Sequence, residues 1–235
     1  TNCAALSDGN RRTYAIRRLW LMIPLKVLFP ALALTLSVGA CRTAYYGAME
    51  RFGVEKRDIL VERVDDVRNE QGETRTEFAD ALEQFRSVVT IDGGELEEKY
   101  DRLNRANNRI NAQANDLRGR IKDVDNVAKA LFREWENELD DYSDASLRRT
   151  SAEQLRVTQA RYADLLDSMN RAASRMDPVL EIFDDQVLFL KHNLNARAIS
   201  SLETERDEIE MRVNRLIREM DAAIAEADAF IATMS

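Results

Sequence analysis

Apolar side chains recur along most of the chain, from Leu60 to Phe230, in steps that alternate between three and four residues. Residues at this spacing share one face of an α-helix, so the pattern predicts long amphipathic helices. Polar Gln71 and Thr74 stand in the middle of the first stripe, which predicts that this part of its helix is weaker or more exposed. The first stripe comprises Leu60, Val64, Val67, Gln71, Thr74, Phe78, Ala81, Phe85 and Val88.

The second stripe is the longest and predicts a helix about 70 Å long, at 1.5 Å per residue. Before it, the segment TIDGGELEE contains Gly93 and Gly94, either of which can take the left-handed conformation that ends a helix. Asn107 falls within the stripe, where a buried amide can fix the register at some cost in stability. The second stripe comprises Leu96, Tyr100, Leu103, Asn107, Ile110, Ala114, Leu117, Ile121, Val124, Ala128, Leu131, Trp135, Leu139 and Tyr142.

The third stripe begins after the pattern lapses at DDYSDASLRRTSAEQ, where Ser143 or Asp144 is expected to cap a new helix. Thr150 and Glu153 also have the spacing of a capping box. Pro178 lies inside the stripe and predicts a kink or a fresh helix start, because proline lacks a backbone donor and restricts the preceding residue. The third stripe comprises Leu155, Thr158, Tyr162, Leu165, Met169, Ala172, Met176, Val179, Phe183, Val187, Leu190 and Leu194.

A final stripe predicts a last helix that reaches Phe230. Two interpretations stand for the segment LKHNLNARAISS that precedes it. A turn near residues 193–200, with Ser200 and Glu203 as a capping box, gives four helices, whereas one unbroken helix gives three. We favour the turn. The final stripe comprises Leu202, Ile209, Val213, Leu216, Met220, Ile224, Ala227 and Phe230.

The fold class that these stripes predict is all-α. Successive helices joined by short loops run antiparallel, so we expect an elongated antiparallel bundle, or coiled-coil hairpins, forming a single domain over residues 41–235. The composition agrees, because Gly and Pro together number only 11 of the 235 residues. A β-sandwich or barrel would need many more residues suited to tight turns.

Charge and composition narrow the classes of function. The chain has a net charge of −8, and an acidic surface is unsuited to binding the phosphates of nucleic acid. Two cysteines and one histidine leave little material for a structural metal site or a disulfide framework. The sequence contains no Gly-rich phosphate loop, nucleophile elbow or HExxH motif. We therefore expect neither an enzyme nor a cofactor.

The residues before Cys41 differ in kind from the rest. Five basic residues and one acidic residue precede it, so the net charge divides into +4 before Cys41 and −12 from it onward. The apolar run Val27–Gly39 is too short to span a bilayer but has the length of the apolar region of a secretory signal peptide. It ends in Val38, Gly39, Ala40 and Cys41, which resembles the lipobox of bacterial lipoproteins.

This resemblance implies that the Cys41 thiol takes a diacylglyceryl group, that the chain is cut before this residue, and that the new amine is acylated, for example with palmitate. Met22 opens a stretch with the order of a whole signal peptide, so residues 22–40 are expected to be the signal and 1–21 upstream sequence. Arg42 follows the cysteine in place of the aspartate of inner-membrane retention, which by analogy implies the periplasmic face of an outer membrane. The alternative is an unprocessed hydrophobic helix with a chance cysteine.

Four stretches carry a second resemblance: AYYGAMERFGVEKRDILVERV, EQFRSVVTIDGGELEEKYDRLN, LFREWENELDDYSDASLRR and DQVLFLKHNLNARAI. They resemble an uncharacterised proteobacterial lipoprotein family, the domain of unknown function 2959, over essentially all of the chain from Cys41. The resemblance implies a helical bacterial lipoprotein. It carries over no activity, cofactor or catalytic residue.

One polar segment is a candidate site. His192 is the only histidine, and it lies near Asn193, Asn195 and Arg197. The segment either binds a partner or polar ligand, or it caps a helix and reverses the chain, which we favour. A lone imidazole cannot make a transition-metal site.

Acidic residues gather in the sequence just before this segment. Asp177, Glu181, Asp184 and Asp185 suggest a carboxylate cluster. Adjacent residues of a helix point apart, however, so we do not expect acid–base catalysis from them.

Two sets of residues rich in aromatic side chains allow both a structural and a functional interpretation. Phe132 and Trp135 are expected to pack in the core or at a bundle end rather than to form a ligand site. Tyr45, Met49 and Phe52 lie four and then three residues apart. They either rest on lipid headgroups or begin the core stripe of the first helix.

Together these observations predict a lipid-anchored periplasmic helical protein that acts as a scaffold or adaptor without catalysis. Its expected partners are the membrane, through the lipid, and a protein, and self-association is a further option. The alternative is a membrane-surface scaffold that binds or shapes lipid through a kinked bundle. The charge of −12 disfavours that alternative, because anionic lipid repels an acidic face.

Overall fold

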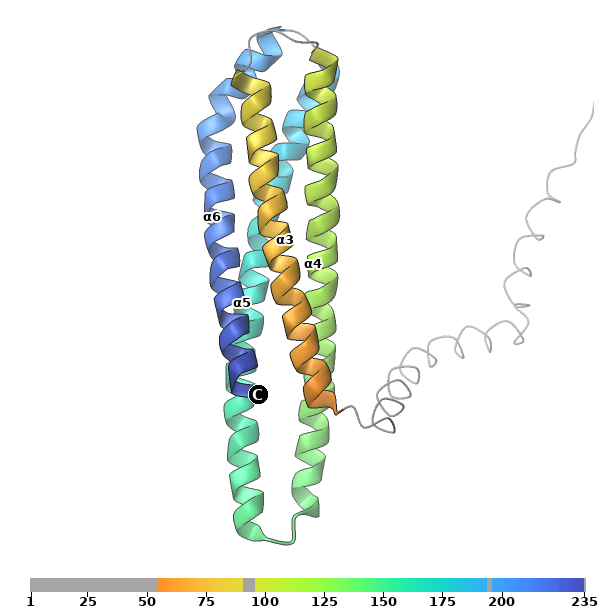
Figure 1. Ribbon diagram of the computed structural model, residues 1–235, viewed down its shortest axis with the longest axis vertical. Coiled ribbons are helices and arrows are strands. Elements are labelled where there is room, and N and C mark those ends of the chain that lie inside the picture. Colours follow the sequence, from red (N-terminus) through yellow and green to blue (C-terminus); the bar gives the residue numbers. More distant parts are fainter. Residues whose placement is uncertain (1–54, 91–95, 194–195, 235) are drawn as a thin grey trace, which may run out of the picture. The chain divides into compact units, whose positions relative to one another are not determined.

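Four α-helices make up most of the part of the chain that the computed structural model describes, residues 55–90, 96–193 and 196–234 (Figure 1). The prediction of an all-α fold is confirmed, and of the two alternatives near residue 193 the structure has the turn. A 3₁₀ turn, Leu139–Asp141, follows the second of these helices. The helices are α3 (Lys56–Thr90), α4 (Leu96–Glu138), α5 (Ala145–His192) and α6 (Ala196–Met234).

The helices run alternately in opposite directions as a four-helix bundle (Figure 1). α3 packs against α4 and α6, and α5 packs against the same two helices, so the ring closes between α3 and α6. Across the centre, the rings of Phe85 and Phe183 meet edge to face with their centroids 6.1 Å apart. The expected antiparallel bundle is therefore confirmed.

The predicted stripes form the core of this bundle. All nine members of the first stripe are at most 1% exposed. The third and fourth stripes are also buried along most of their length, and Thr158 and Ile224 are half-buried exceptions. Each large apolar side chain removed from water contributes about 1.5–3 kcal/mol, so this continuous core is the main source of stability.

The prediction that the middle of the first stripe is more exposed is wrong. Gln71 and Thr74 are both fully buried. The Thr74 hydroxyl donates to the Glu70 carbonyl oxygen at 2.7 Å, which satisfies it within the helix. Because α4 and α6 flank this face of α3, the position on the helix decides burial, whatever the polarity of the side chain.

The helix start after the 3₁₀ turn has one of the expected caps. The Asp144 side chain accepts hydrogen bonds from the backbone N–H groups of Ser146 and Leu147 at 2.6 and 3.1 Å. The capping box proposed for Thr150 is wrong, since Thr150 lies inside α5 and its hydroxyl donates to the Ser146 carbonyl oxygen. Ser200 is likewise inside a helix, because α6 begins at Ala196.

Pro178 does not start a new helix, because α5 continues through it. Proline removes one intrahelical hydrogen bond, at a cost of about 3 kcal/mol in a helix interior. Met176, Val179 and Leu180 beside it are buried in the core. Their packing holds the two halves of α5 together.

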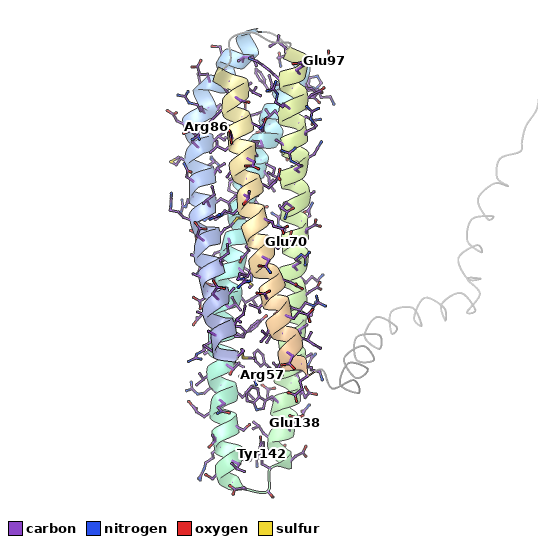
Figure 2. The ribbon with its side chains drawn as sticks, in the orientation of Figure 1. Arg57, Glu70, Arg86, Glu97, Glu138 and Tyr142 are labelled. Carbon is purple, nitrogen blue, oxygen red and sulfur yellow. The ribbon has the colours of Figure 1, made fainter. Side chains whose placement is uncertain are left out.

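The ends of α4 and α5 form a hairpin that extends past the first residue of α3 and the last residue of α6 (Figure 1). Figure 2 shows Glu138 and Tyr142 beyond the level of Arg57 on α3. The second stripe therefore loses its cover at its end, and Tyr142 is 41% exposed. At the start of α5, Leu147 is 58% exposed for the same reason.

Several predictions concern residues outside the described ranges. These are the lipidation site Cys41 with Val38, Gly39 and Ala40, the stripe of Tyr45, Met49 and Phe52, and the helix end at Gly93 or Gly94. Among the helices that the structure describes, none combines the length and apolar character needed to cross a bilayer.

Candidate functional site

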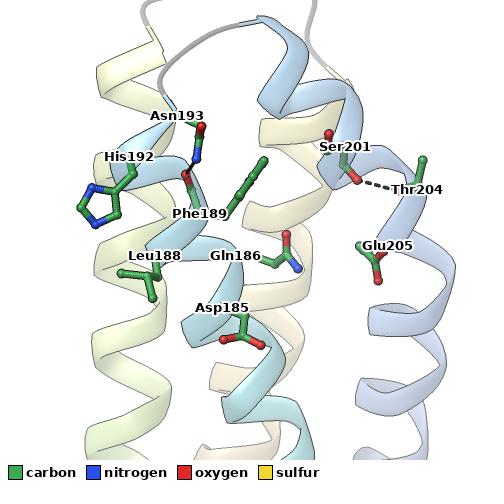
Figure 3. Close-up of a pocket in the computed structure, with 9 residues that line it drawn as sticks. All are labelled: Asp185, Gln186, Leu188, Phe189, His192, Asn193, Ser201, Thr204 and Glu205. Carbon is green, nitrogen blue, oxygen red and sulfur yellow. Dashed lines mark hydrogen bonds between the residues drawn. The ribbon is translucent and has the colours of Figure 1, made fainter.

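An open cavity of about 520 Å³ lies between the last turns of α5 and the first turns of α6 (Figure 3). Its walls combine apolar, polar and acidic side chains from both helices. It lies at the end of α5 opposite the α4–α5 hairpin, because α5 begins in that hairpin and ends at His192.

The apolar part of the wall comes from Leu188 and Phe189, which are 55% and 39% exposed. Their neighbours Val187 and Leu190 face the core and are buried. These four consecutive apolar residues thus point to different sides of α5, and only Val187 and Leu190 pack in the core. The apolar wall of the cavity was not predicted from the sequence, although this run of four apolar residues could have indicated it.

Part of the polar wall belongs to the predicted segment. His192, the last residue of α5, lines the cavity and is exposed. Asn193 also lines it and ends the helix: its backbone N–H donates to the Leu190 carbonyl oxygen at 3.1 Å and its side-chain amide to that of Phe189 at 3.0 Å. The favoured role of Asn193 in capping is thus supported. Asn195 and the side chain of Arg197 lie outside the described part.

The acidic part of the wall comes from Asp185 on α5 and Glu205 on α6 (Figure 3). The cavity is also lined by the uncharged polar residues Gln186, Ser201 and Thr204. The Thr204 hydroxyl donates to the Ser201 carbonyl oxygen at 2.6 Å, so it is satisfied within its own helix.

The suspected carboxylate cluster does not form a common site. Asp184 faces α4, where it accepts hydrogen bonds from the amides of Asn107 at 2.6 Å and Asn111 at 3.2 Å. Asp177 pairs with Arg118, also on α4. Within the described ranges, no three His, Cys, Asp or Glu side chains are placed to hold a metal ion.

The aromatic residues near the hairpin pack as expected. Phe132 is buried and meets Tyr162 edge to face, with ring centroids 5.5 Å apart. The half-buried Trp135 donates its indole N–H to the Ser151 hydroxyl at 2.8 Å. Burial raises the pKa of Tyr162, and the nearby Asp125 carboxylate raises it further. These residues close the end of the core.

Arginines on α3 join it to acidic residues on α6. Arg86 donates to Glu210 at 2.7 Å, and this hydrogen bond holds the pKa of the Glu210 carboxyl below its ordinary value. Arg68–Asp228 and Arg75–Asp221 make the same kind of contact, each at 2.9 Å. These pairs are on the surface and fix the register of the two helices.

A buried carboxylate joins α3 to α4. Glu70 is 7% exposed, accepts a hydrogen bond from the Gln113 amide at 2.6 Å and pairs with Arg120 at 2.5 Å. Because both of its oxygens are occupied, it is a structural contact. A smaller cavity of about 250 Å³ lies between α4 and α5, and Asp125 forms part of its lining. One carboxylate oxygen of Asp125 pairs with Lys129, and the other accepts a hydrogen bond from the Tyr162 hydroxyl.

Comparison with known proteins shows to which family the chain belongs. The family model described as protein of unknown function (DUF2959) matches residues 45–234. The chain belongs to this family. The match spans all four helices, and it confirms the family resemblance that the four sequence stretches indicated. No curated protein and no solved structure matches the chain.

Proposed function

We propose that this protein is a lipid-anchored adaptor of the bacterial envelope that binds a protein partner at the α5–α6 cavity. The observation that carries the proposal is the open cavity itself. Leu188 and Phe189 expose apolar surface there, beside polar and charged groups. Exposed apolar surface with a polar rim is typical of protein–protein contact sites.

In this proposal the bundle acts as a spacer between the predicted lipid site and the cavity. α3 begins at Lys56, fifteen residues after the predicted lipid site Cys41. α3 has 35 residues and is therefore about 50 Å long. The cavity lies at the opposite end of the bundle from Lys56, so the bundle would present it about 50 Å from the point where the tether enters.

The charge supports a protein partner over a lipid one. From Cys41 onward the net charge is −12, and the cytoplasmic or periplasmic surface of a membrane with anionic lipid repels such a chain. The lipid on Cys41 supplies the membrane attachment in this proposal, which leaves the bundle free to bind a protein.

Metabolic labelling with a fatty acid tests the anchor. We expect label on the wild-type chain and on a Cys3→Ala control, and none on Cys41→Ala, because the thiol of Cys41 is the proposed acceptor. The Cys41→Ala chain should also leave the membrane fraction. Label retained on Cys41→Ala would contradict the anchor.

Paired variants test the docking surface. Leu188→Ser with Phe189→Ser removes the apolar wall, whereas Met211→Ser removes a 64% exposed side chain of α6 outside the cavity. We expect a protein that co-purifies from solubilised membranes with the wild type and Met211→Ser, and that is lost with the double variant. Equal recovery with all three chains would contradict docking at the cavity.

A further inference from the structure

Two carboxylates, that of Asp185 on α5 and that of Glu205 on α6, line the cavity between these helices. Arg212 Nη1 donates to the Pro178 carbonyl oxygen at 3.4 Å, so these two residues lie near each other across the seam between α5 and α6. Asp185 lies seven residues after Pro178, and Glu205 lies seven residues before Arg212. Because the helices are antiparallel, both residues lie at about the same level. Figure 3 shows the Gln186 side chain of α5 directed toward α6, with Asp185 and Glu205 on either side of it in the cavity lining.

Among the described residues that line the cavity, none is an arginine or a lysine. Further along, Arg175 pairs with Glu219 at 3.9 Å, and Arg212 reaches across to Pro178. Among the described residues, no ion-pair or hydrogen-bond partner lies against the carboxylate of Asp185 or that of Glu205. Two like charges in one cavity repel, and a cation bound beside them reduces that repulsion and is attracted to both.

The rest of the wall restricts what kind of cation can bind. Leu188 and Phe189 are exposed beside the carboxylates, so a hydrated metal ion would leave the apolar surface uncovered. The volume of about 520 Å³ is within the range of ligand sites and is large enough for several side chains. A fitting ligand therefore combines positive charge with apolar surface.

We propose that the cavity binds a basic, apolar peptide segment of a protein partner. An arginine or lysine of that segment lies in the cavity near Asp185 and Glu205, and an apolar side chain next to it covers Leu188 and Phe189. An arginine gains further, because its planar guanidinium forms paired hydrogen bonds to a carboxylate and stacks on an aromatic ring such as Phe189. This inference rests on the proposed adaptor function and gives the chemistry of its partner.

Titration with a synthetic peptide tests the inference. The probe is a twelve-residue peptide of alternating leucine and arginine, and the comparison peptide alternates leucine and glutamate. Asp185→Asn with Glu205→Gln removes both carboxylates of the cavity. The control, Glu203→Gln with Asp207→Asn, removes the same charge from exposed positions of α6 that do not line the cavity.

We expect the basic peptide to bind the wild-type chain and the control, and to bind the cavity variant three- to tenfold more weakly, the change typical of two partly exposed ion pairs. Binding should also weaken between 50 and 200 mM salt, concentrations at which charge screening shortens to roughly 14 and 7 Å. Equal weakening in both variants, or binding of the acidic peptide, would overturn the inference.

The co-purification experiment separates this inference from the adaptor function. If Leu188→Ser with Phe189→Ser loses a partner that Asp185→Asn with Glu205→Gln retains, the adaptor function stands and the basic chemistry is overturned. If both double variants retain every partner, both proposals are overturned. Loss of the same partner in both double variants supports both.

Discussion

Gln71 shows how the bundle treats a polar residue in its core. The side chain is fully buried, and neither polar atom of its amide has a hydrogen-bond partner among the described residues. A buried amide without partners costs about 1–3 kcal/mol. The residue therefore lowers the stability of the fold where its neighbours in the stripe raise it.

Replacing this amide should stabilise the protein. We expect Gln71→Leu to raise the free energy of unfolding by about 1–3 kcal/mol, because a leucine of similar size removes the desolvation cost. Gln113→Leu should instead lower it, since Gln113 donates to the buried Glu70 carboxylate at 2.6 Å. Urea denaturation of the two variants measures both changes. A loss of stability in Gln71→Leu would show that its amide has a partner in solution.

The ion pair between Arg86 and Glu210 contributes to stability in a way that depends on pH. Its folded pKa is lowered by the hydrogen bond from Arg86, so the contribution is present above the ordinary pKa of glutamate and is lost as the pH falls through the lowered value. We expect Glu210→Gln to be less stable than the wild type at pH 7, by at most about 0.5 kcal/mol for so exposed a pair.

Denaturation over a series of pH values measures this effect. The difference between the wild type and Glu210→Gln should begin to shrink near the ordinary pKa of glutamate, about 4.3, and should vanish only once the pH has fallen below the lowered pKa of Glu210. Asp80→Asn, an exposed change on α3, the helix that carries Arg86, is the matched control. A difference that grows as the pH falls would contradict the assigned sign.

At the scale of elements, the projecting hairpin depends on its own local contacts. Residues 142–150 are all exposed, and α3 and α6 do not extend alongside them. The Asp144 cap, the ion pair of Arg148 with Asp140 and the bond between Trp135 and Ser151 are among the contacts that hold this end. Elements with so few buried contacts open locally without global unfolding.

Removing the cap should therefore show in local exchange. We expect Asp144→Ala to speed hydrogen exchange in the first turns of α5 about fivefold, the equivalent of about 1 kcal/mol for a lost cap. Exchange in α3 should not change, and Asp141→Asn should have no effect. If exchange speeds up equally in α3, the hairpin opens only with the whole bundle.

The sequence predicted the helices well because burial along one face leaves a periodic trace. It predicted the caps less well, because the pairs Thr150 with Glu153 and Ser200 with Glu203 have capping spacing yet lie inside helices. The exposed face at Tyr142 also could not be predicted, since it depends on where α3 and α6 begin and end.

For the candidate site, the sequence indicated His192 and Asn193 but not the rest. Leu188 lies in an apolar run whose pattern does not say which members leave the core. That Asp185 and Glu205 line one cavity depends on how α5 and α6 pack against each other, which the sequence of either helix does not show.

At the scale of the whole bundle, the first residue of α3 and the cavity lie at opposite ends. The chain enters the bundle at Lys56, beside Glu134 near the hairpin, with the two side chains 2.7 Å apart. The cavity is formed where α5 passes into α6, at the other end of α5. This separation fits an adaptor that holds its binding surface away from the membrane.

Photo-crosslinking in intact cells tests the central claim, docking at the cavity, most directly. A photoreactive amino acid is placed at Gln186 within the cavity and, as the control, at Met211 outside it. We predict a discrete adduct of one protein from position 186, absent from position 211 and lost when Phe189→Ser is added. The same adducts from both positions, or none from position 186, would contradict the account.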